Sequence, residues 1–166
     1  MLHRILPPAF DNQFPGHPLA LWLFAPIVFL KVMAAQTHIF TADGGAQSIS
    51  TIPLDTYPAS AAQNIIGLFA RIGLEQLAFA LLLLLALVRY RSVIPLLYLM
   101  LVGHYLALRA ISAAKPLVFA GTSGVKYMSL AVSIVSLVGL VLSLVPRGAS
   151  AGAGRASEAV PHIHAP

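Results

Sequence analysis

The sequence predicts an all-α fold, a polytopic membrane four-helix bundle, on the strength of its composition and of its apolar pattern. Of the 166 residues, 58% are hydrophobic and only 9% are charged, whereas a typical soluble domain has roughly 25% charged residues. The apolar residues also form four long blocks instead of recurring at helical or strand spacing, which is typical of transmembrane segments. Each block is close to the ~20 residues that a helix needs to cross ~30 Å of hydrocarbon.

The blocks place the spans at about residues 18–36, 65–88, 93–111 and 125–145, within one transmembrane domain, residues 18–146. Residues 1–17 form an N-terminal segment, and residues 89–92 form a tight hairpin between the second and third spans. We expect the first span to be retained and not cleaved as a signal peptide, because Lys31 interrupts its apolar block. The tail, residues 147–166, is rich in Ala and Gly without periodicity and is predicted to be disordered.

The basic residues predict the orientation, because cytoplasmic segments carry an excess of Lys and Arg. The connection between spans 1 and 2 has none, only Asp43 and Asp55. Lys115 and Lys126, between spans 3 and 4, oppose the assignment. The N-terminal segment, the hairpin between spans 2 and 3 and the C-terminal tail lie on the opposite side of the membrane from the connection between spans 1 and 2. These segments contain Arg4, Arg89, Arg91, Arg147 and Arg155. We therefore expect both termini in the cytoplasm.

Several classes of function have no support in the sequence. The Lys and Arg residues lie singly at helix ends without a basic face, so we expect no nucleic-acid binding. Cysteine is absent, which removes disulfides, thiol redox chemistry and thiolate metal sites. No nucleophile with a base, nucleotide-binding loop or metal triad is recognisable. We predict no catalytic residue, metal or cofactor.

The second span contains Arg71, Glu75 and Gln76 within two turns. A charge at the centre of a spanning helix costs about 2.5–3.5 kcal/mol on insertion scales. Because Arg71 and Glu75 are four positions apart, they lie on the same face of a helix. We expect an ion pair that turns toward the other helices.

The third span predicts that these residues belong to a larger polar cluster. If spans 2 and 3 fold together about Tyr90, Glu75 and His104 lie within about 2 Å of the same depth. Arg71 and Arg109 are nearly level by the same count. Lys31, near the end of the first span, reaches a similar depth. The predicted intramembrane cluster is Lys31, Arg71, Glu75, Gln76, His104 and Arg109.

This cluster has more than one interpretation. Lys31 and Arg109 could extend to lipid phosphates at the interface. Otherwise the excess positive charge needs an anionic partner such as a lipid headgroup or a small solute. Glu75 beside His104 also resembles a proton-relay pair. A bis-histidine haem site is disfavoured, because His38 lies outside the first span.

The fourth span has small residues at intervals of four, three, three and four, which puts them on one face. Such a face lets two membrane helices approach closely. We expect it to pack inside the bundle, with a homodimer interface as the alternative. Its residues are Ser129, Ser133, Ser136, Gly139 and Ser143.

Residues 12–24, 52–57 and 88–98 together resemble a group of uncharacterised four-helix inner-membrane proteins of proteobacteria. The resemblance implies a bacterial inner-membrane location and carries no assigned activity. A looser resemblance, to the DoxX-type four-helix membrane proteins, rests on Glu75 and Arg89. It implies an accessory role beside membrane redox systems.

Three functions follow as expectations. The first is a non-catalytic accessory, assembly or scaffold subunit, with membrane lipids, a larger membrane complex or a second copy as partners. The second is a small carrier, proton-coupled or for an anionic solute, that uses Arg71, Glu75 and His104. The third is a membrane redox accessory that binds a lipid or quinone.

Overall fold

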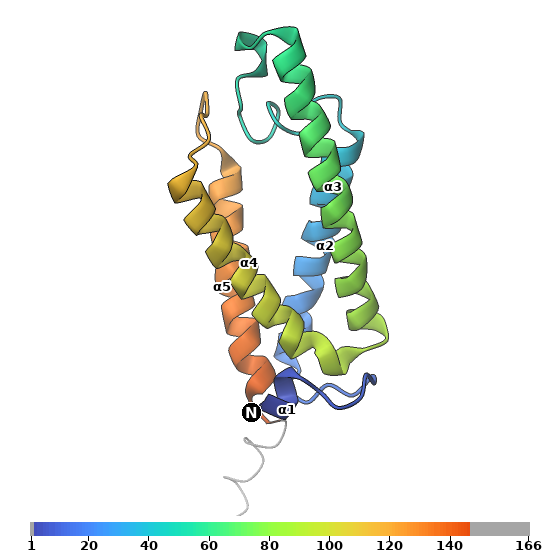
Figure 1. Ribbon diagram of the computed structural model, residues 1–166. Helices are drawn as coiled ribbons and strands as arrows, with labels where there is room; N and C mark the ends of the chain where they lie inside the picture. Colours follow the sequence, from blue (N-terminus) through green and yellow to red (C-terminus); the bar gives the residue numbers. More distant parts are fainter. Residues whose placement is uncertain (1, 147–166) are drawn as a thin grey trace, which may run out of the picture.

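The computed structural model describes residues 2–146, and its long elements are all helices. Each of the four long helices is long and apolar enough to cross a membrane. The prediction of an all-α chain with four such helices is confirmed, and the predicted disordered tail, residues 147–166, lies outside the described residues. In chain order (Figure 1) the elements are α1 (Leu2–Ile5), α2 (Leu19–Phe40), η1 (Leu54–Thr56), α3 (Ala59–Val88), η2 (Arg91–Val93), α4 (Ile94–Ala114) and α5 (Gly124–Leu144).

Two helices extend four or more residues further than the hydropathy pattern predicts. α2 continues to Phe40 instead of ending at residue 36, and α3 begins at Ala59 instead of residue 65. Hydropathy detects only residues suited to hydrocarbon, whereas the first turns of α3, directly after Pro58, are helical but contain only Ala, Ser, Gln and Asn. Because 30 residues of helix measure about 45 Å, α3 is longer than the hydrocarbon is thick. An untilted α3 is therefore long enough for its first turns to reach the headgroup region.

The four long helices form two pairs. α2 packs along α3, α4 packs along α5, and α2 also contacts α5. The expectation that the second and third spans lie side by side is wrong, because α3 and α4 meet near their connecting turn and then diverge (Figure 1). This turn is tied to the N-terminal segment through buried Ser92, whose hydroxyl accepts a hydrogen bond from the Asp11 amide at 3.0 Å.

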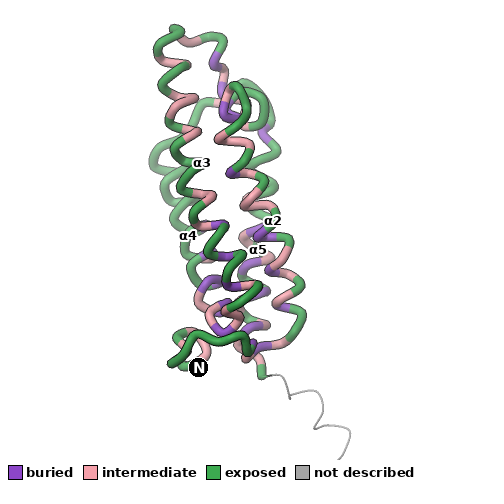
Figure 2. The backbone as a smooth tube through the Cα atoms, turned by 90° about the vertical axis from the view of Figure 1, so that its right-hand side faces the viewer, coloured by how far each residue is buried: buried purple, intermediate pink, exposed green. Residues whose placement is uncertain are grey.

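Most of the core lies at the base of the molecule, where the N-terminal segment and the α3–α4 turn meet. Figure 2 shows most of the buried residues in this half, and a smaller buried group, Ala46, Ile52 and Leu54, in the α2–α3 loop at the far end. Tyr98 is fully buried, its hydroxyl donates a hydrogen bond to the Ala20 carbonyl at 2.6 Å, and its ring meets Phe24 edge-on at 5.1 Å. The two helix pairs are therefore fastened to each other at the base.

The loops join the two pairs again at the far end. The Ala120 amide donates a hydrogen bond to the Thr51 carbonyl at 2.8 Å, which links the α4–α5 loop to the α2–α3 loop. The α2–α3 loop is organised around Asp43, whose carboxylate accepts hydrogen bonds from the amides of Gly45, Gln47 and Ser48. Partial burial raises the pKa of Asp43, but these hydrogen bonds outweigh it and lower the pKa to about 2.

Candidate functional site

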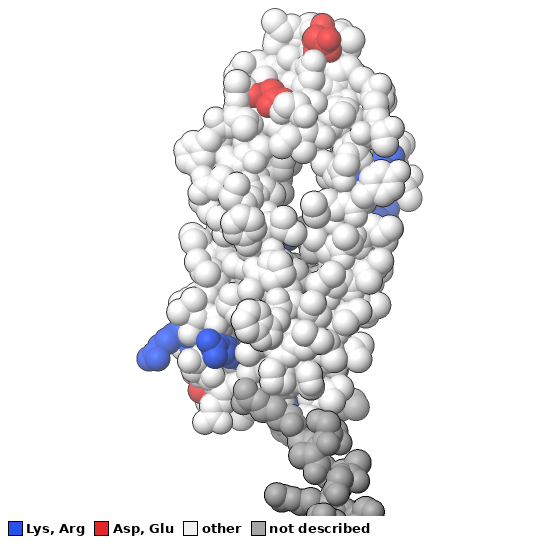
Figure 3. Space-filling view, turned by 180° about the vertical axis from the view of Figure 1, so that it is seen from behind, with Lys and Arg blue, Asp and Glu red and all other residues white. Residues whose placement is uncertain are grey.

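A cavity of about 570 Å³ lies between the α2–α3 pair and the α4–α5 pair. We call it the central cavity. The space between the two pairs is visible from behind in Figure 3. All four long helices contribute to its walls, which are mainly apolar, with residues such as Ile27, Leu30, Phe69, Ile72, Leu108 and Val132. The cavity exists because the pairs are joined at both ends but separate in between.

Lys31 is the charged residue of the central cavity. It comes from the middle of α2, is half-buried, and has its Nζ 5.0 Å from the ring centroid of Tyr105 on α4. Among the described residues that line the cavity, none is Asp or Glu. A cation–π contact contributes about 0.5–2 kcal/mol, whereas taking an ammonium group out of water costs several kcal/mol. Tyr105 alone therefore does not compensate the charge of Lys31.

Neutral polar groups lie in the same walls. Gln76 of α3 is half-buried and lines the cavity, and His104 of α4 lines it beside Tyr105, with the two rings edge-on at 5.3 Å. Ser129 of α5 contributes a hydroxyl. These groups give the cavity that contains Lys31 hydrogen-bonding capacity but no negative charge.

His38 also lines the cavity, which the sequence analysis did not foresee. His38 lies past the predicted end of the first span at residue 36, but it is still helical, because α2 extends to Phe40. Its Nδ1 lies 2.7 Å from the Gly44 carbonyl, so this nitrogen is the donor, and its ring packs edge-on against Phe69. Extending the helical period of the first span past residue 36 would have placed His38 on the same face as Lys31.

The structure brings together only half of the predicted polar cluster. Lys31, Gln76 and His104 share the central cavity, whereas Arg71, Glu75 and Arg109 are exposed on outer surfaces of their helices. No carboxylate lies within 4.0 Å of a basic group among residues 2–146, so the expected Arg71–Glu75 pair facing the other helices is wrong.

The cause is the rotation of α3. Gly73 and Ala80, both buried, form the side of α3 that lies against α2. A Cβ atom at residue 73 would stand 2.7 Å from the Cβ of His38, so the helices cross closely at this point. At 100° per residue, Arg71 and Glu75 are then on the opposite side of α3.

The small-residue face of α5 is used inside the molecule. Ser136, Gly139 and Ser143 are buried, and a Cβ at residue 139 would overlap the ring of Tyr98. Ser129 and Ser133 are half-buried. The face is therefore occupied by α4 and the N-terminal segment and is not available to a second copy of the chain.

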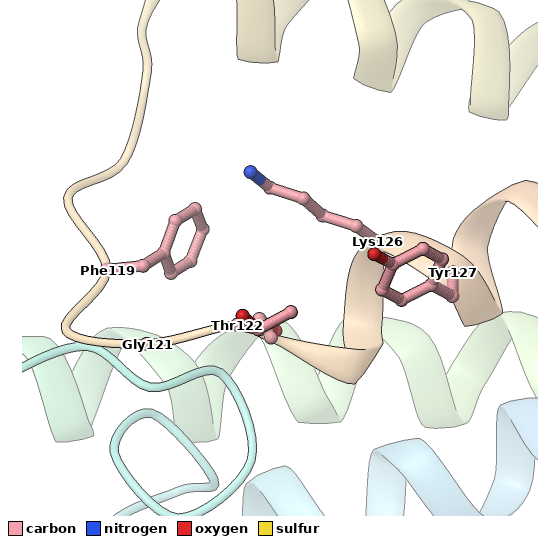
Figure 4. A pocket seen from close by; sticks show the side chains of 6 residues that line it. Phe119, Gly121, Thr122, Lys126 and Tyr127 are labelled. Carbon is pink, nitrogen blue, oxygen red and sulfur yellow. The ribbon is translucent and has the colours of Figure 1, made fainter.

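A second, open hollow lies at the far end, where the α4–α5 loop meets the start of α5. Figure 4 shows the Lys126 side chain extending over the hollow toward Phe119, with its Nζ 5.1 Å from the ring centroid. Gly121, Thr122, Ser123 and Tyr127 complete the lining. Because Lys126 is exposed, water can solvate its charge here, unlike that of Lys31.

Among residues 2–146 no three His, Asp or Glu side chains are grouped as metal ligands. Comparisons with protein families, with curated proteins and with solved structures found no match to this chain.

Proposed function

We propose that this protein is a non-catalytic membrane accessory protein that holds one lipid-like molecule in the central cavity, with an anionic or carbonyl group of that molecule at Lys31. The proposal rests on the environment of Lys31. This cation is half-buried in a mainly apolar cavity, and the described residues that line the cavity include no carboxylate. A bound anionic or carbonyl oxygen would accept a hydrogen bond from its Nζ and compensate its charge.

The dimensions of the cavity support an amphipathic ligand. Its volume of about 570 Å³ falls within the roughly 300–1,000 Å³ of small-molecule sites. Apolar residues such as Leu30, Ile72 and Leu108 match an acyl or isoprenoid chain. The hollow between the two pairs is open in the space-filling view of Figure 3, which supports entry of a ligand from the side without crossing the bilayer. Anionic lipids and quinones are the two classes with this chemistry.

The carrier alternative receives less support. It needs Arg71, Glu75 and His104 in one site, whereas Arg71 and Glu75 lie on the side of α3 away from α2 and His104 lines the cavity. A proton relay from Glu75 to His104 has no geometric basis here, so the accessory function is the better proposal.

The membrane in which the protein resides is part of the same proposal. A bacterial inner-membrane location rests on the resemblance of residues 12–24, 52–57 and 88–98 to proteobacterial inner-membrane proteins. Cytoplasmic termini rest on Arg4, Arg89 and Arg91 at the base of the molecule. In that orientation the central cavity lies in the outer half of the bilayer.

The test is to identify what the protein retains when it is purified in a mild detergent. We expect mass spectrometry of the extract to show one anionic-lipid or quinone class enriched over the bulk membrane. Lys31→Met should retain about tenfold less or lower, because a charge-assisted hydrogen bond contributes about 1.5–3 kcal/mol. The two ligand classes differ in mass and in ultraviolet absorption, so the extract also distinguishes them.

Arg109→Gln is the matched control, because it removes one positive charge from an exposed position outside the cavity. It should retain the wild-type amount. An extract with the composition of the bulk membrane, or equal retention by Lys31→Met and the wild type, would contradict the proposal.

A further inference from the structure

The side of α3 that faces away from α2 is uncovered along its length. Its residues recur at alternating intervals of three and four, which is the spacing of a helix that packs lengthwise against another helix. Leu68 is 55% exposed and Leu82 is 58% exposed. We call this surface the outward face of α3; it consists of Leu68, Arg71, Glu75, Ala78, Leu82 and Leu85, all of them exposed.

The outward face carries charge at a depth where lipid is a poor neighbour. Counting from Val88 at the base, Glu75 lies about 20 Å up the helix and Arg71 about 26 Å. Both positions fall within the roughly 30 Å of hydrocarbon. Arg71 is long enough to reach the interface, but the shorter Glu75 is not. Ionisable residues at such depth almost always face protein or water instead of lipid.

We propose that a second copy of this chain covers the outward face of α3, with Arg71 of each copy paired to Glu75 of the other. The face is self-complementary, since each copy presents one positive and one negative charge. A two-fold axis along the bilayer normal relates the copies, because both are inserted in the same orientation and symmetric dimers use one patch twice. The pairing neutralises all four charges without any other protein.

The geometry of two parallel helices permits these pairs. Packed helix axes are about 8–10 Å apart, and Arg71 and Glu75 differ in height by about 6 Å. An extended Arg side chain spans that offset, as in the ion pairs that flank coiled coils. Ala78, one turn closer to the base, is small and lets the two helices approach.

The dimer leaves the central cavity accessible. The α3 residues that line the cavity are Phe69, Ile72 and Gln76, and none of them belongs to the outward face. The dimer therefore does not depend on the proposed ligand.

The first test uses the absence of cysteine in the natural sequence. Ala78→Cys places one thiol at the centre of the outward face. We expect oxidation in native membranes to cross-link it into a dimer of twice the chain mass. Leu106→Cys is the control, since residue 106 is exposed on α4 and belongs to no proposed interface. No cross-linking of Ala78→Cys, or cross-linking to a different protein, would overturn the proposal.

The second test distinguishes pairing between copies from pairing within one helix. Both variants are made in the Ala78→Cys background. Arg71→Glu puts two acidic side chains on the outward face, and Glu75→Arg puts two basic side chains there. Each variant alone should lose about tenfold or more of the cross-linked dimer, because like charges then face each other. Co-expressed with different tags, the two variants should form a mixed dimer at the wild-type level. An intrahelical pair cannot be restored in this way, so failure of the mixed dimer would overturn the proposal.

Discussion

Tyr98 is the residue at which three of the four long helices meet. Its hydroxyl is bonded to the Ala20 carbonyl of α2, its ring contacts Phe24, and Gly139 of α5 leaves the space for it. The spacing of small residues predicted that Gly139 is part of a small-residue face. The Tyr98 ring packs against that face at Gly139. The partner could not be identified in advance, because spacing along one helix says nothing about which helix lies opposite.

Gly139→Ala should destabilise the protein by about 1–3 kcal/mol or more, because the new methyl group overlaps the Tyr98 ring. The measurement is the unfolding midpoint in detergent. Ser136→Ala is the control one turn away: Ser136 is fully buried, and its Oγ has no hydrogen-bond partner within residues 2–146. Its removal should leave the midpoint unchanged or higher. Equal loss in both variants would contradict the assigned role of Gly139.

Asp43 should make the α2–α3 loop sensitive to acid. Its pKa of about 2 in the folded protein is below the unfolded value of about 3.9. The stabilisation is therefore complete above pH ~4 and is lost as the pH falls toward 2. Amide hydrogen exchange at Gly45 and Ser48, corrected for its intrinsic pH dependence, should show this loss. Asp43→Ala should loosen the loop already at neutral pH.

Asp55→Ala is the control for Asp43, because Asp55 is an exposed carboxylate of the same loop. It should leave the protection of Gly45 and Ser48 unchanged at every pH. Protection in the Asp43→Ala variant equal to that of the wild type would show that the carboxylate does not organise the loop.

At the scale of single elements, the existence of the long helices was predictable and their rotation was not. Hydropathy located four spans because lipid selects apolar residues over a fixed length. It placed the start of α3 too late, since residues 59–64 are helical but contain Ser60, Gln63 and Asn64 and no large apolar residue. The charges of α3 were expected to face inward, yet Gly73 and Ala80 turn the opposite side of the helix toward α2. The rotation of α3 is therefore set by the close packing of its small residues against α2 and not by the burial of its charged residues.

Gly73 is the test of this account of α3. Gly73→Ala should lower stability, because the added Cβ would lie 2.7 Å from the His38 Cβ and 3.2 Å from the Ala35 carbonyl oxygen. Gly67→Ala in the same helix meets nothing within 4 Å, so it should be neutral or stabilising by up to about 1 kcal/mol, the gain in helix propensity. The unfolding midpoints of the two variants should therefore move in opposite directions or differ clearly. A stabilising Gly73→Ala would contradict the close crossing of α2 and α3.

At the scale of the molecule, the chain is two helix pairs joined at both ends, with a cavity between them. Three polar residues of that cavity, Lys31, Gln76 and His104, were predicted from the sequence to lie together, but they were also grouped with Arg71, Glu75 and Arg109. The error came from assuming that a short turn makes α3 and α4 run side by side. The turn is instead held against the N-terminal segment through Ser92 and Asp11. Hydropathy contains no information about such a contact.

We propose that the cavity between the pairs holds one lipid-like molecule at Lys31. The most direct test of this claim is native mass spectrometry of the intact protein released from a mild detergent, which counts bound molecules per chain. We predict one bound lipid-like molecule per chain for the wild type and for Arg109→Gln. For Lys31→Met we predict a chain without a bound molecule. A bare wild-type chain, or an adduct that persists in Lys31→Met at the wild-type level, would contradict the claim.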